Sequence, residues 1–328
     1  MDVLAIGDTV IDDFIRLKDA SAHCDINHEQ CMLSLRFGDK VPFEFNVLVP
    51  GVGNSANAAV ACARLGLQSA LRVHVGDDDR GRVCIDALKA QGVDTSLVAV
   101  EAGKLTNYHY VLWYESERTI LVKHESYAYS MPQLAVSPKW IYLSSLADKT
   151  EPYHHEIAAY LAAHPEVKLA FQPGTFQMKL GAAALKDVYE RTEIFFCNKE
   201  EAQRILGITE HDIARLLDGI HALGPKVVVI TDGREGSYAR EESGRMWHAP
   251  MYPDPTPPKE RTGAGDACAS TTVAYLVKGM SLEKSLLRGQ INSMNVVQEI
   301  GAQKGLLTAD EIEAWYAKRP PEYKATDL

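Results

Sequence analysis

Short apolar segments alternate with segments of helical periodicity along most of the chain. The apolar segments have few polar residues at alternate positions, which is typical of strands buried on both faces of a parallel sheet. They cover residues 3–6, 70–75, 140–143, 169–171, 194–197 and 227–231. Helical patterns between them cover residues 57–65, 80–91, 152–163, 181–190, 199–206 and 212–223. This order of elements predicts an α/β fold with a doubly wound, mostly parallel central sheet flanked by helices.

Two regions, approximately residues 14–50 and 105–124, depart from this pattern. Their hydrophobic and polar residues alternate, most clearly in residues 43–49 and 108–114, which predicts antiparallel strands. We expect the two regions to form one small β-sheet inserted in the α/β body, where it would serve as a lid. The alternative is a pair of separate surface hairpins.

Composition and charge narrow the range of functions. The chain has 328 residues and a formal net charge of −10, which makes a nucleic acid an unsuitable partner. The first residues show no signal-peptide pattern, and no segment reaches the roughly 20 apolar residues of a membrane span. We therefore expect a cytoplasmic protein with no membrane partner. Its six scattered cysteines favour reduced thiols, with a metal site or disulfide at Cys24 and Cys31 as the alternative.

The most informative motif is Gly263-Ala264-Gly265-Asp266, which opens a helical pattern. Glycines at a helix N-terminus let backbone N–H groups close around an anion, typically a phosphate. A carboxylate beside a bound phosphate is repelled by it unless the carboxylate has a chemical role. Asp266 is therefore a candidate general base that takes a proton from an attacking hydroxyl group. The alternative is an ordinary turn with Asp266 as a helix cap.

Four further motifs accompany this loop in a fixed order. They occupy residues 50–66, 76–81, 198–201 and 231–233. Together the five motifs resemble the ribokinase-like (PfkB) carbohydrate and nucleoside kinases over essentially the whole chain. The resemblance implies one kinase domain over residues 1–328 and transfer of the γ-phosphoryl group of ATP to a hydroxyl of a small sugar.

The resemblance also implies roles for individual residues. Asp266 is similar to the family's catalytic base, and the N–H groups of Gly263, Ala264 and Gly265 to its anion hole. Asn198 and Glu201 resemble the pair that organises Mg²⁺ near the nucleotide phosphates, with Glu201 acting through water. A solvated first-turn position is the alternative for Glu201.

The resemblance places the acceptor at Asp12, Gly53 and Asn57. Asp12 is expected to accept hydrogen bonds from sugar hydroxyls, with Asp13 as the competing candidate. The nucleotide-binding positions implied are Thr231 and Gly233, together with Asn292 and Asn295, which share one helix face and could approach the adenine. An exposed polar face is the alternative for these two asparagines.

Several positions depart from the family pattern and leave the acceptor open. They are Val52, Ser144-Ser145, Gln172-Pro173-Gly174, Glu260, Arg261 and Cys268. A nucleoside could stack on Tyr108, Tyr110, Trp113 or Tyr114. A sugar phosphate could meet Arg118 or Lys123. A ligand-binding protein without turnover is the non-enzyme alternative.

The expected cofactors are ATP and Mg²⁺, with K⁺ as a further candidate near residues 251–260. The resemblance also implies a homodimer formed through the lid.

Overall fold

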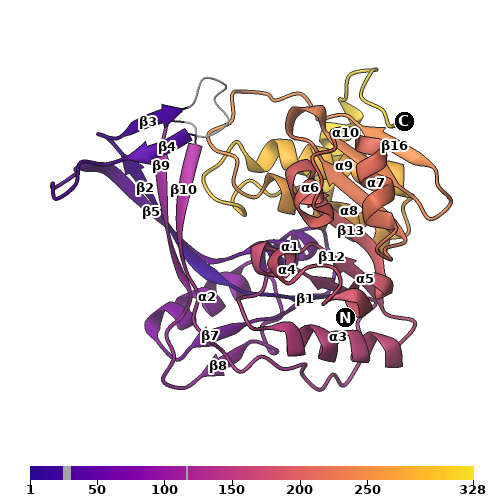
Figure 1. The fold of residues 1–328 in the computed structure, drawn as a ribbon, viewed down its shortest axis with the longest axis horizontal. Coiled ribbons are helices and arrows are strands. Elements are labelled where there is room, and N and C mark those ends of the chain that lie inside the picture. The colour runs from indigo at the N-terminus through magenta and orange to yellow at the C-terminus, as the bar shows by residue number, and fades with distance from the viewer. Residues whose placement is uncertain (25–30, 116) are drawn as a thin grey trace.

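The computed structural model describes residues 1–24, 31–115 and 117–328, and its main feature is a nine-stranded sheet (Figure 1). The strand order is β17 (Thr326–Asp327), β16 (Met246–Ala249), β15 (Ser237–Arg240), β14 (Val227–Thr231), β13 (Thr192–Asn198), β12 (Lys168–Phe171), β11 (Trp140–Leu143), β1 (Val3–Ile6) and β6 (Ser69–Arg72). Neighbouring strands from β14 to β6 are parallel, and those from β14 to β17 are antiparallel. The predicted fold class, an α/β protein with a mostly parallel central sheet, is confirmed.

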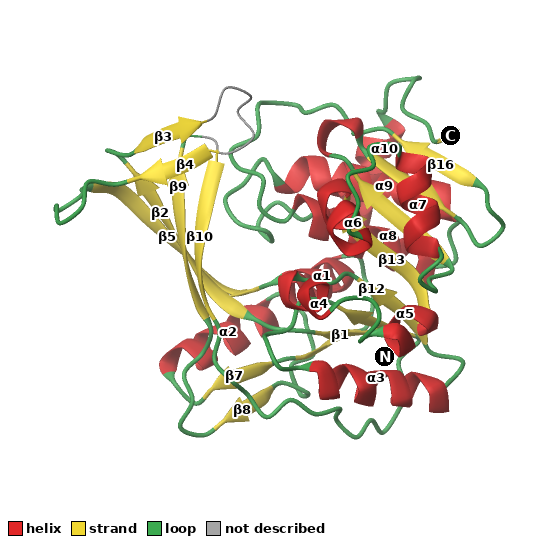
Figure 2. Ribbon diagram, in the orientation of Figure 1, coloured by secondary structure: helices red, strands yellow, loops and turns green. Residues whose placement is uncertain are grey.

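Helices cover both faces of this sheet (Figure 2). One face carries α1 (Asn54–Arg64), α8 (Ala264–Val277), α9 (Leu282–Val296) and α10 (Ala309–Ala317). The other face carries α3 (Glu151–Ala163), α5 (Lys186–Arg191), α6 (Lys199–Leu206) and α7 (Ile213–His221). In β1, Val3 and Ala5 belong to the first hydrophobic core, whereas Leu4 and Ile6 belong to the second. Because successive side chains point to opposite faces, a strand between two cores must be apolar throughout.

Most predicted elements lie where the sequence pattern placed them, with two corrections. Residues 70–75 are not one strand, because β6 ends at Arg72 and β7 (His74–Gly76) pairs with β8 (Ala99–Glu101) in a separate sheet. The predicted helix over residues 181–190 starts too early, because only its second half, from Lys186, is helical. The chain instead forms α4 (Thr175–Leu180), then a break, then α5. Gly181 ends α4 with φ of 85°, a left-handed conformation that stops a helix.

The two alternating regions contribute strands to one four-stranded sheet, which we call the lid sheet. It consists of β10 (Glu117–Lys123), β9 (Tyr108–Tyr114), β2 (Val10–Leu17) and β5 (Phe43–Val52), in that order. The β2–β9 pair is parallel, so the sheet is mixed rather than wholly antiparallel as predicted. A separate hairpin, β3 (Ser21–Cys24) and β4 (Cys31–Ser34), comes from the same region. Residues 25–30 of that region lie outside the described residues. Figure 1 shows the lid sheet projecting from the body.

The cysteines differ in part from the sequence-based expectation. Four of them are free and buried: Cys62, Cys84, Cys197 and Cys268. Cys31 is disulfide-bonded, so the expectation of reduced thiols throughout is wrong at this residue. Within residues 1–24, 31–115 and 117–328, no helix combines the length and hydrophobicity needed to cross a bilayer.

Candidate active site

A cavity of about 400 Å³ lies where the lid sheet meets the α/β body. Its lining includes Gln172, which follows β12, Asn198 at the end of β13, and Thr231 at the end of β14. These are carboxyl ends of parallel strands, the edge at which ligands bind in open α/β sheets. The lid strands contribute Asp12 and Ile120 from the opposite side. The cavity therefore has one wall from each sheet, and its volume suits a small-molecule ligand.

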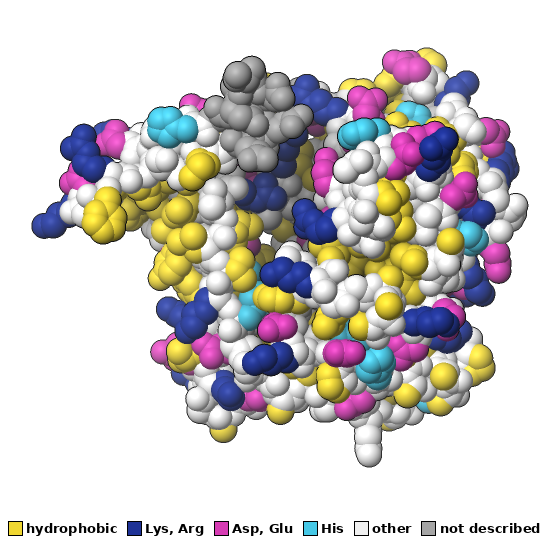
Figure 3. Space-filling model, in the orientation of Figure 1, with side chains coloured by type: hydrophobic (Ala, Val, Ile, Leu, Met, Phe, Trp, Pro, Cys, Tyr) yellow, Lys and Arg dark blue, Asp and Glu magenta, His cyan; other side chains and the backbone are white. Residues whose placement is uncertain are grey.

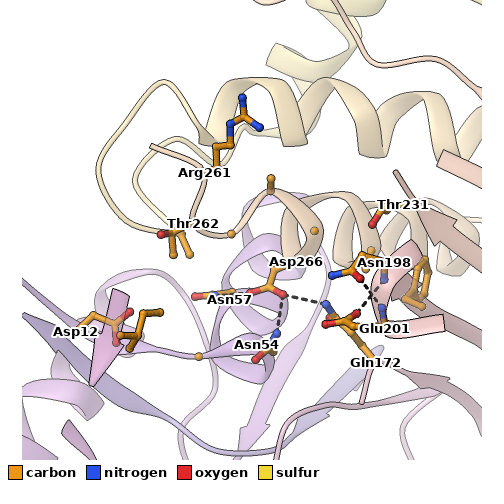
Figure 4. A pocket seen from close by; sticks show the side chains of 18 of the residues that line it. Asp12, Asn54, Asn57, Gln172, Asn198, Glu201, Thr231, Arg261, Thr262 and Asp266 are labelled. Carbon is orange, nitrogen blue, oxygen red and sulfur yellow. Dashed lines mark hydrogen bonds between the residues drawn. The ribbon is translucent and has the colours of Figure 1, made fainter. Parts of the chain in front are cut away.

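Asp266 lies in the first turn of α8 and reaches the centre of this cavity (Figure 4). Asn54 and Asn57, both on α1, donate hydrogen bonds of 2.8 Å to its Oδ1 and Oδ2 respectively. Gln172 donates a third hydrogen bond of 3.0 Å to Oδ1. The carboxylate is thus held by amide groups from two elements distant in sequence.

Burial and hydrogen bonding act on Asp266 in opposite directions. Burial raises the pKa of Asp266 because the ionised form loses solvation. The hydrogen bonds from Asn57, Gln172 and Asn54, and then the charge of Arg118, lower it. The net shift is upward, which makes the carboxylate a better proton acceptor than an exposed aspartate.

The loop before Asp266 is closely fitted to the protein. Gly263 has φ of 83°, and a Cβ at this residue would lie 2.5 Å from the Cβ of Ala302. Gly265 faces open space, since a Cβ there would meet nothing within 4 Å. Glu260, which is 3% exposed, accepts hydrogen bonds from the N–H groups of Thr262 and Gly301 at 2.6 and 2.8 Å. The unusual Glu260 therefore fixes the loop, whose residues Gly263, Ala264 and Gly265 line the cavity.

Asp12 and Asp13 are adjacent in β2 but face opposite sides of the lid sheet. Asp12 lines the cavity, and its Oδ1 is 3.2 Å from Nδ1 of His109 but has no well-formed hydrogen bond. Asp13 accepts hydrogen bonds from Asn46 at 3.1 Å and from the Tyr108 hydroxyl at 3.0 Å. Of the two acidic candidates, Asp12 is therefore the one with an atom available to a ligand.

Behind Asp12, a chain of polar side chains leads away from the cavity. His109 Nε2 lies 3.4 Å from His124 Nε2, and His124 Nδ1 lies 3.2 Å from Asp8. The Tyr129 hydroxyl donates to Asp8 at 2.7 Å. This chain secures His109 beside Asp12, a contact between β2 and β9 that no local sequence pattern predicts.

Asn198 and Glu201 form a reciprocal cap at the start of α6. Asn198 Oδ1 accepts from the Glu201 N–H at 2.7 Å, and Glu201 Oε2 accepts from the Asn198 N–H at 2.9 Å. Burial raises the pKa of Glu201, more than its hydrogen bond with the Asn198 backbone lowers it. Both residues line the cavity with Thr231. Figure 4 shows this pair on one side of Asp266 and Asp12 on the other.

These residues suit a magnesium ion carried by a nucleotide. The described residues include no cluster of three or more His, Cys, Asp or Glu side chains able to hold a metal alone. Mg²⁺ commonly keeps several waters and binds through one or two carboxylates plus substrate phosphates. Glu201, with Oε1 outside the cap hydrogen bond, fits that donor set.

A second cavity of about 100 Å³ adjoins the first. Arg261 and Ala264 line both cavities, and Gly233 and Ser293 line the second. Gly53 lines the first cavity as the residue before α1, with φ of 116°.

Asn292 and Asn295 lie on α9 but line neither cavity. Asn292 donates to Thr271 at 2.7 Å and accepts from the Leu307 N–H at 2.8 Å. Asn295 donates to the Gly305 carbonyl at 2.8 Å. The structure therefore does not bring these two residues together with the other candidates.

Sequence reasoning assigned no site role to several residues that the structure places in the cavity. They are Asn54, His109, Gln172 and Arg261. Asn54 and Asn57 are three residues apart on α1, a spacing that puts them on one helix face. That spacing was the one local signal available, because the partners of these side chains come from other elements.

Comparisons with known proteins show the family of the chain. The model of the family described as pfkB family carbohydrate kinase matches residues 23–309. The 5-dehydro-2-deoxygluconokinase of Bacillus subtilis is 27% identical over 277 residues, covering 80% of this chain and 85% of the relative. The ribokinase of the same organism is 28% identical over 271 residues, covering 81% and 87%.

Among solved structures, Arabidopsis thaliana ribokinase complexed with ribose and ATP has a similar fold. Its TM-score is 0.79 at 17% identity, covering 96% of this chain and 98% of that one. A raised-pKa carboxylate beside helix N-terminal amides suits phosphoryl transfer to a hydroxyl group. The chain belongs to the pfkB family of carbohydrate kinases. It is therefore a phosphotransferase that acts on an alcohol group, and a sugar kinase.

Proposed function

We propose that the protein transfers the γ-phosphoryl group of ATP to a hydroxyl of a small sugar, with Asp266 as the general base. The observation that carries this proposal is the position of Asp266, held by three amide groups between the two sides of the cavity. Asp12 and the lid lie on one side, where an acceptor fits. Asn198, Glu201 and Thr231 lie on the other, where nucleotide phosphates fit.

In the proposed reaction Asp266 accepts the proton of the acceptor hydroxyl. The acceptor oxygen forms a bond to the γ-phosphorus, and the bond from that phosphorus to the β–γ bridging oxygen breaks, leaving ADP. The N–H groups of the loop of residues 263–265 offset the negative charge on the group in transfer. Asn54, Asn57 and Gln172 keep Asp266 aligned with the attacking oxygen.

Mg²⁺ bound with the nucleotide supplies positive charge to its phosphates. We assign its protein contact to Glu201 through water, with Asn198 holding Glu201 in place. Thr231 ends β14 and lines the first cavity, and Gly233 follows β14 and lines the second, which supports a nucleotide lying along both. A requirement for K⁺ and a cytoplasmic location stay predictions.

We propose that Asp12, with Gly53 beside it, accepts hydrogen bonds from the hydroxyls of the acceptor. The amide of Asn57 is engaged at both ends, since it donates to Asp266 and accepts from Gln303 at 3.0 Å. This arrangement favours a role for Asn57 in orienting the base, and its contact with the acceptor stays a prediction.

The cavity favours a non-aromatic acceptor over a nucleoside. The four aromatic residues considered for base stacking do not line it: Tyr108, Tyr110, Trp113 and Tyr114. Trp113 instead contacts Arg16 and Phe45. Arg118 does line the cavity, which supports the sugar-phosphate alternative among acidic acceptors.

We also propose a homodimer formed through the lid sheet. Leu48, Tyr110 and Leu121 are 48%, 44% and 52% exposed. The strand register places them in one row with Asp13, on the face opposite Asp12. Analytical ultracentrifugation of the wild type and of Leu121→Lys tests this contact. A dimer that the substitution dissociates supports it, and a monomeric wild type contradicts it.

The proposed reaction is tested by ADP release with a panel of sugars, nucleosides and sugar phosphates. We expect ATP-dependent turnover of at least one sugar or sugar derivative, and a loss of more than about 1000-fold in kcat in Asp266→Asn and Asp266→Ala. Circular dichroism and ATP binding of the variants show whether the fold is retained. Turnover near that of the wild type in a folded Asp266 variant contradicts the mechanism.

A further inference from the structure

Arg118 is a lid residue whose side chain reaches the cavity. It lies on β10 two residues before Ile120, so the two side chains share the face of the lid sheet that lines the cavity. Its Nε is buried and has no hydrogen-bond partner. Arg118 is also close enough to Asp266 for its charge to act on that carboxylate. Figure 3 shows the hollow between lid and body, with Lys and Arg side chains at its rim.

A second arginine in the same row of the lid sheet, Arg16, has contacts within the lid that can be compared with those of Arg118. Arg16 pairs in register with Trp113, and Trp113 pairs with Arg118. The Arg16 guanidinium stacks 4.5 Å from the Trp113 ring centroid, donates to the Glu115 carbonyl, and lies 3.9 Å from Glu44. In the part of the chain that the structure describes, Arg118 has no comparable ion pair. The packing of the lid therefore accounts for Arg16 and does not account for Arg118.

Among the described residues, none of the acidic groups near the acceptor side forms an ion pair with Arg118. Asp266 is held by three amides, Glu260 by two backbone N–H groups, Asp13 by Asn46 and Tyr108, and Asp12 lies against His109. Arg261 lines both cavities and so lies toward the nucleotide side. Arg118 thus makes no ion pair with these carboxylates among the described residues, and its charge reaches Asp266 only as a longer-range electrostatic effect.

A partly desolvated guanidinium with an unpaired donor suits a carboxylate or phosphate, which it can bind through two parallel hydrogen bonds. A neutral sugar offers hydroxyl groups only and would leave that charge unpaired. Along β10, Arg118 lies four residues from Val122, which faces His109 and the Asp12 row. This separation is about 13 Å. Arg118 and Asp12 therefore reach the same cavity from separate positions on the lid sheet.

We propose, resting on the kinase function above, that the acceptor is an acidic sugar derivative whose carboxylate or phosphate is bound by Arg118. Arg118 is then the residue that determines specificity for an anionic acceptor over a neutral one. In this arrangement the attacked hydroxyl lies at Asp266, further hydroxyls lie at Asp12, and the anionic group lies at Arg118.

Matched pairs of acceptors test this inference. One pair compares D-gluconate with D-glucitol, for the carboxylate. The other compares D-fructose 6-phosphate with D-fructose, for the phosphate. For the wild type we expect kcat/KM, and affinity measured by calorimetry in the presence of ADP, to favour one anionic member over its neutral counterpart by about 10- to 100-fold.

Arg118→Met should remove this preference by raising KM for the anionic acceptor, with KM for ATP unchanged. Arg118→Lys should retain part of it, because the charge remains while the paired donors are lost. Lys123→Met is the control. Lys123 lies on the same strand but is exposed and ion-paired with Glu125 at 2.9 Å, so the preference should persist.

The inference is overturned if neither anionic compound is favoured in turnover or in binding. It is also overturned if Arg118→Met keeps the preference for the anionic acceptor, or if it weakens ATP binding rather than acceptor binding. Asp266-dependent turnover of neutral sugars without any anion preference would leave the kinase function standing. Anion binding through Arg118 without any turnover would contradict the kinase function and support the anion-binding role of Arg118.

Discussion

The proposed catalytic end and the proposed acceptor end of the cavity differ in how far the protein itself satisfies their polar atoms. At the catalytic end, Asp266 receives three hydrogen bonds, and Asn198 and Glu201 cap each other. At the acceptor end, Asp12 Oδ1 and Arg118 Nε are buried without a hydrogen-bond partner. The first end lies on helices of the body, and the second on strands of the lid sheet.

This difference is the one expected if one end stabilises the reaction and the other selects the acceptor. Groups that stabilise charge in a reaction work best when they are fixed beforehand, because no reorganisation is then needed. Groups that select a substrate gain most when the substrate completes their hydrogen bonds, since an unsatisfied buried group is costly. Changes at the catalytic end should therefore lower kcat, whereas changes at the acceptor end should raise KM.

After the Asp266 variants, the largest effect is expected at the loop. In Gly263→Ala the new Cβ would clash with Ala302 at 2.5 Å and the loop N–H groups would shift, so kcat should fall by about 100- to 1000-fold. Gly279→Ala is the matched control, because Gly279 has the same φ of 83° but nothing within 4 Å. ADP release should be normal in the control. Equal losses of activity in both variants would show that backbone strain alone is responsible.

The next effect separates the two faces of β2. Asp12→Asn should raise KM for the acceptor by about 10- to 100-fold, because charge-assisted hydrogen bonds to its hydroxyls are lost. Asp13→Asn should leave KM unchanged, since that side chain contacts Asn46 and Tyr108 on the other face. Steady-state kinetics at saturating ATP measures both. The reverse order of effects would assign the acceptor to Asp13.

A smaller effect concerns the pH profile. Gln172 donates to Asp266 and thereby lowers the pKa of that residue, against the upward shift caused by burial. Gln172→Leu should therefore raise the pKa of Asp266 further and move the acid limb of kcat/KM to higher pH. Above that limb, the loss of one aligning hydrogen bond should cost about 10-fold. An acid limb that stays in place or moves to lower pH would contradict Asp266 as the titrating base.

The smallest effect on activity is expected on α9. Asn295→Ala should lower the free energy of unfolding by about 1 kcal/mol through the lost bond to Gly305, with KM for ATP unchanged. Ser293→Trp, in the second cavity, should raise KM for ATP. Urea unfolding and ATP titrations measure these outcomes. A KM for ATP that rises in Asn295→Ala but not in Ser293→Trp would support the sequence-based assignment of Asn295 to the nucleotide.

The sequence predicted the body of the molecule better than the lid or the site. Strands such as β1 and β11 were predictable because both of their faces are covered, so burial leaves a continuous apolar run. The start of α5 at Lys186 was not predicted, since apolar residues 182–185 extend the helical pattern toward Gly181. The pairing of β2 with β9 joins segments about ninety residues apart, and no local pattern specifies such a register.

The same limit applies to the site. Asp266 was predictable because its loop and helix are contiguous in sequence. Gln172 was noticed only as a departure from the family pattern, because its partner is 94 residues away. Asn292 was assigned to the nucleotide from its helix face, but tertiary contacts with Thr271 and Leu307 occupy its amide.

The central claim is that Asp266 takes the proton of the acceptor hydroxyl during transfer. Rapid-quench measurement of a single turnover, with enzyme in excess over γ-labelled ATP and saturating acceptor, tests it most directly. We expect the transfer step in Asp266→Asn to slow by more than about 1000-fold while the affinity for ATP stays close to that of the wild type. A transfer step near the rate of the wild type in this variant would contradict the account.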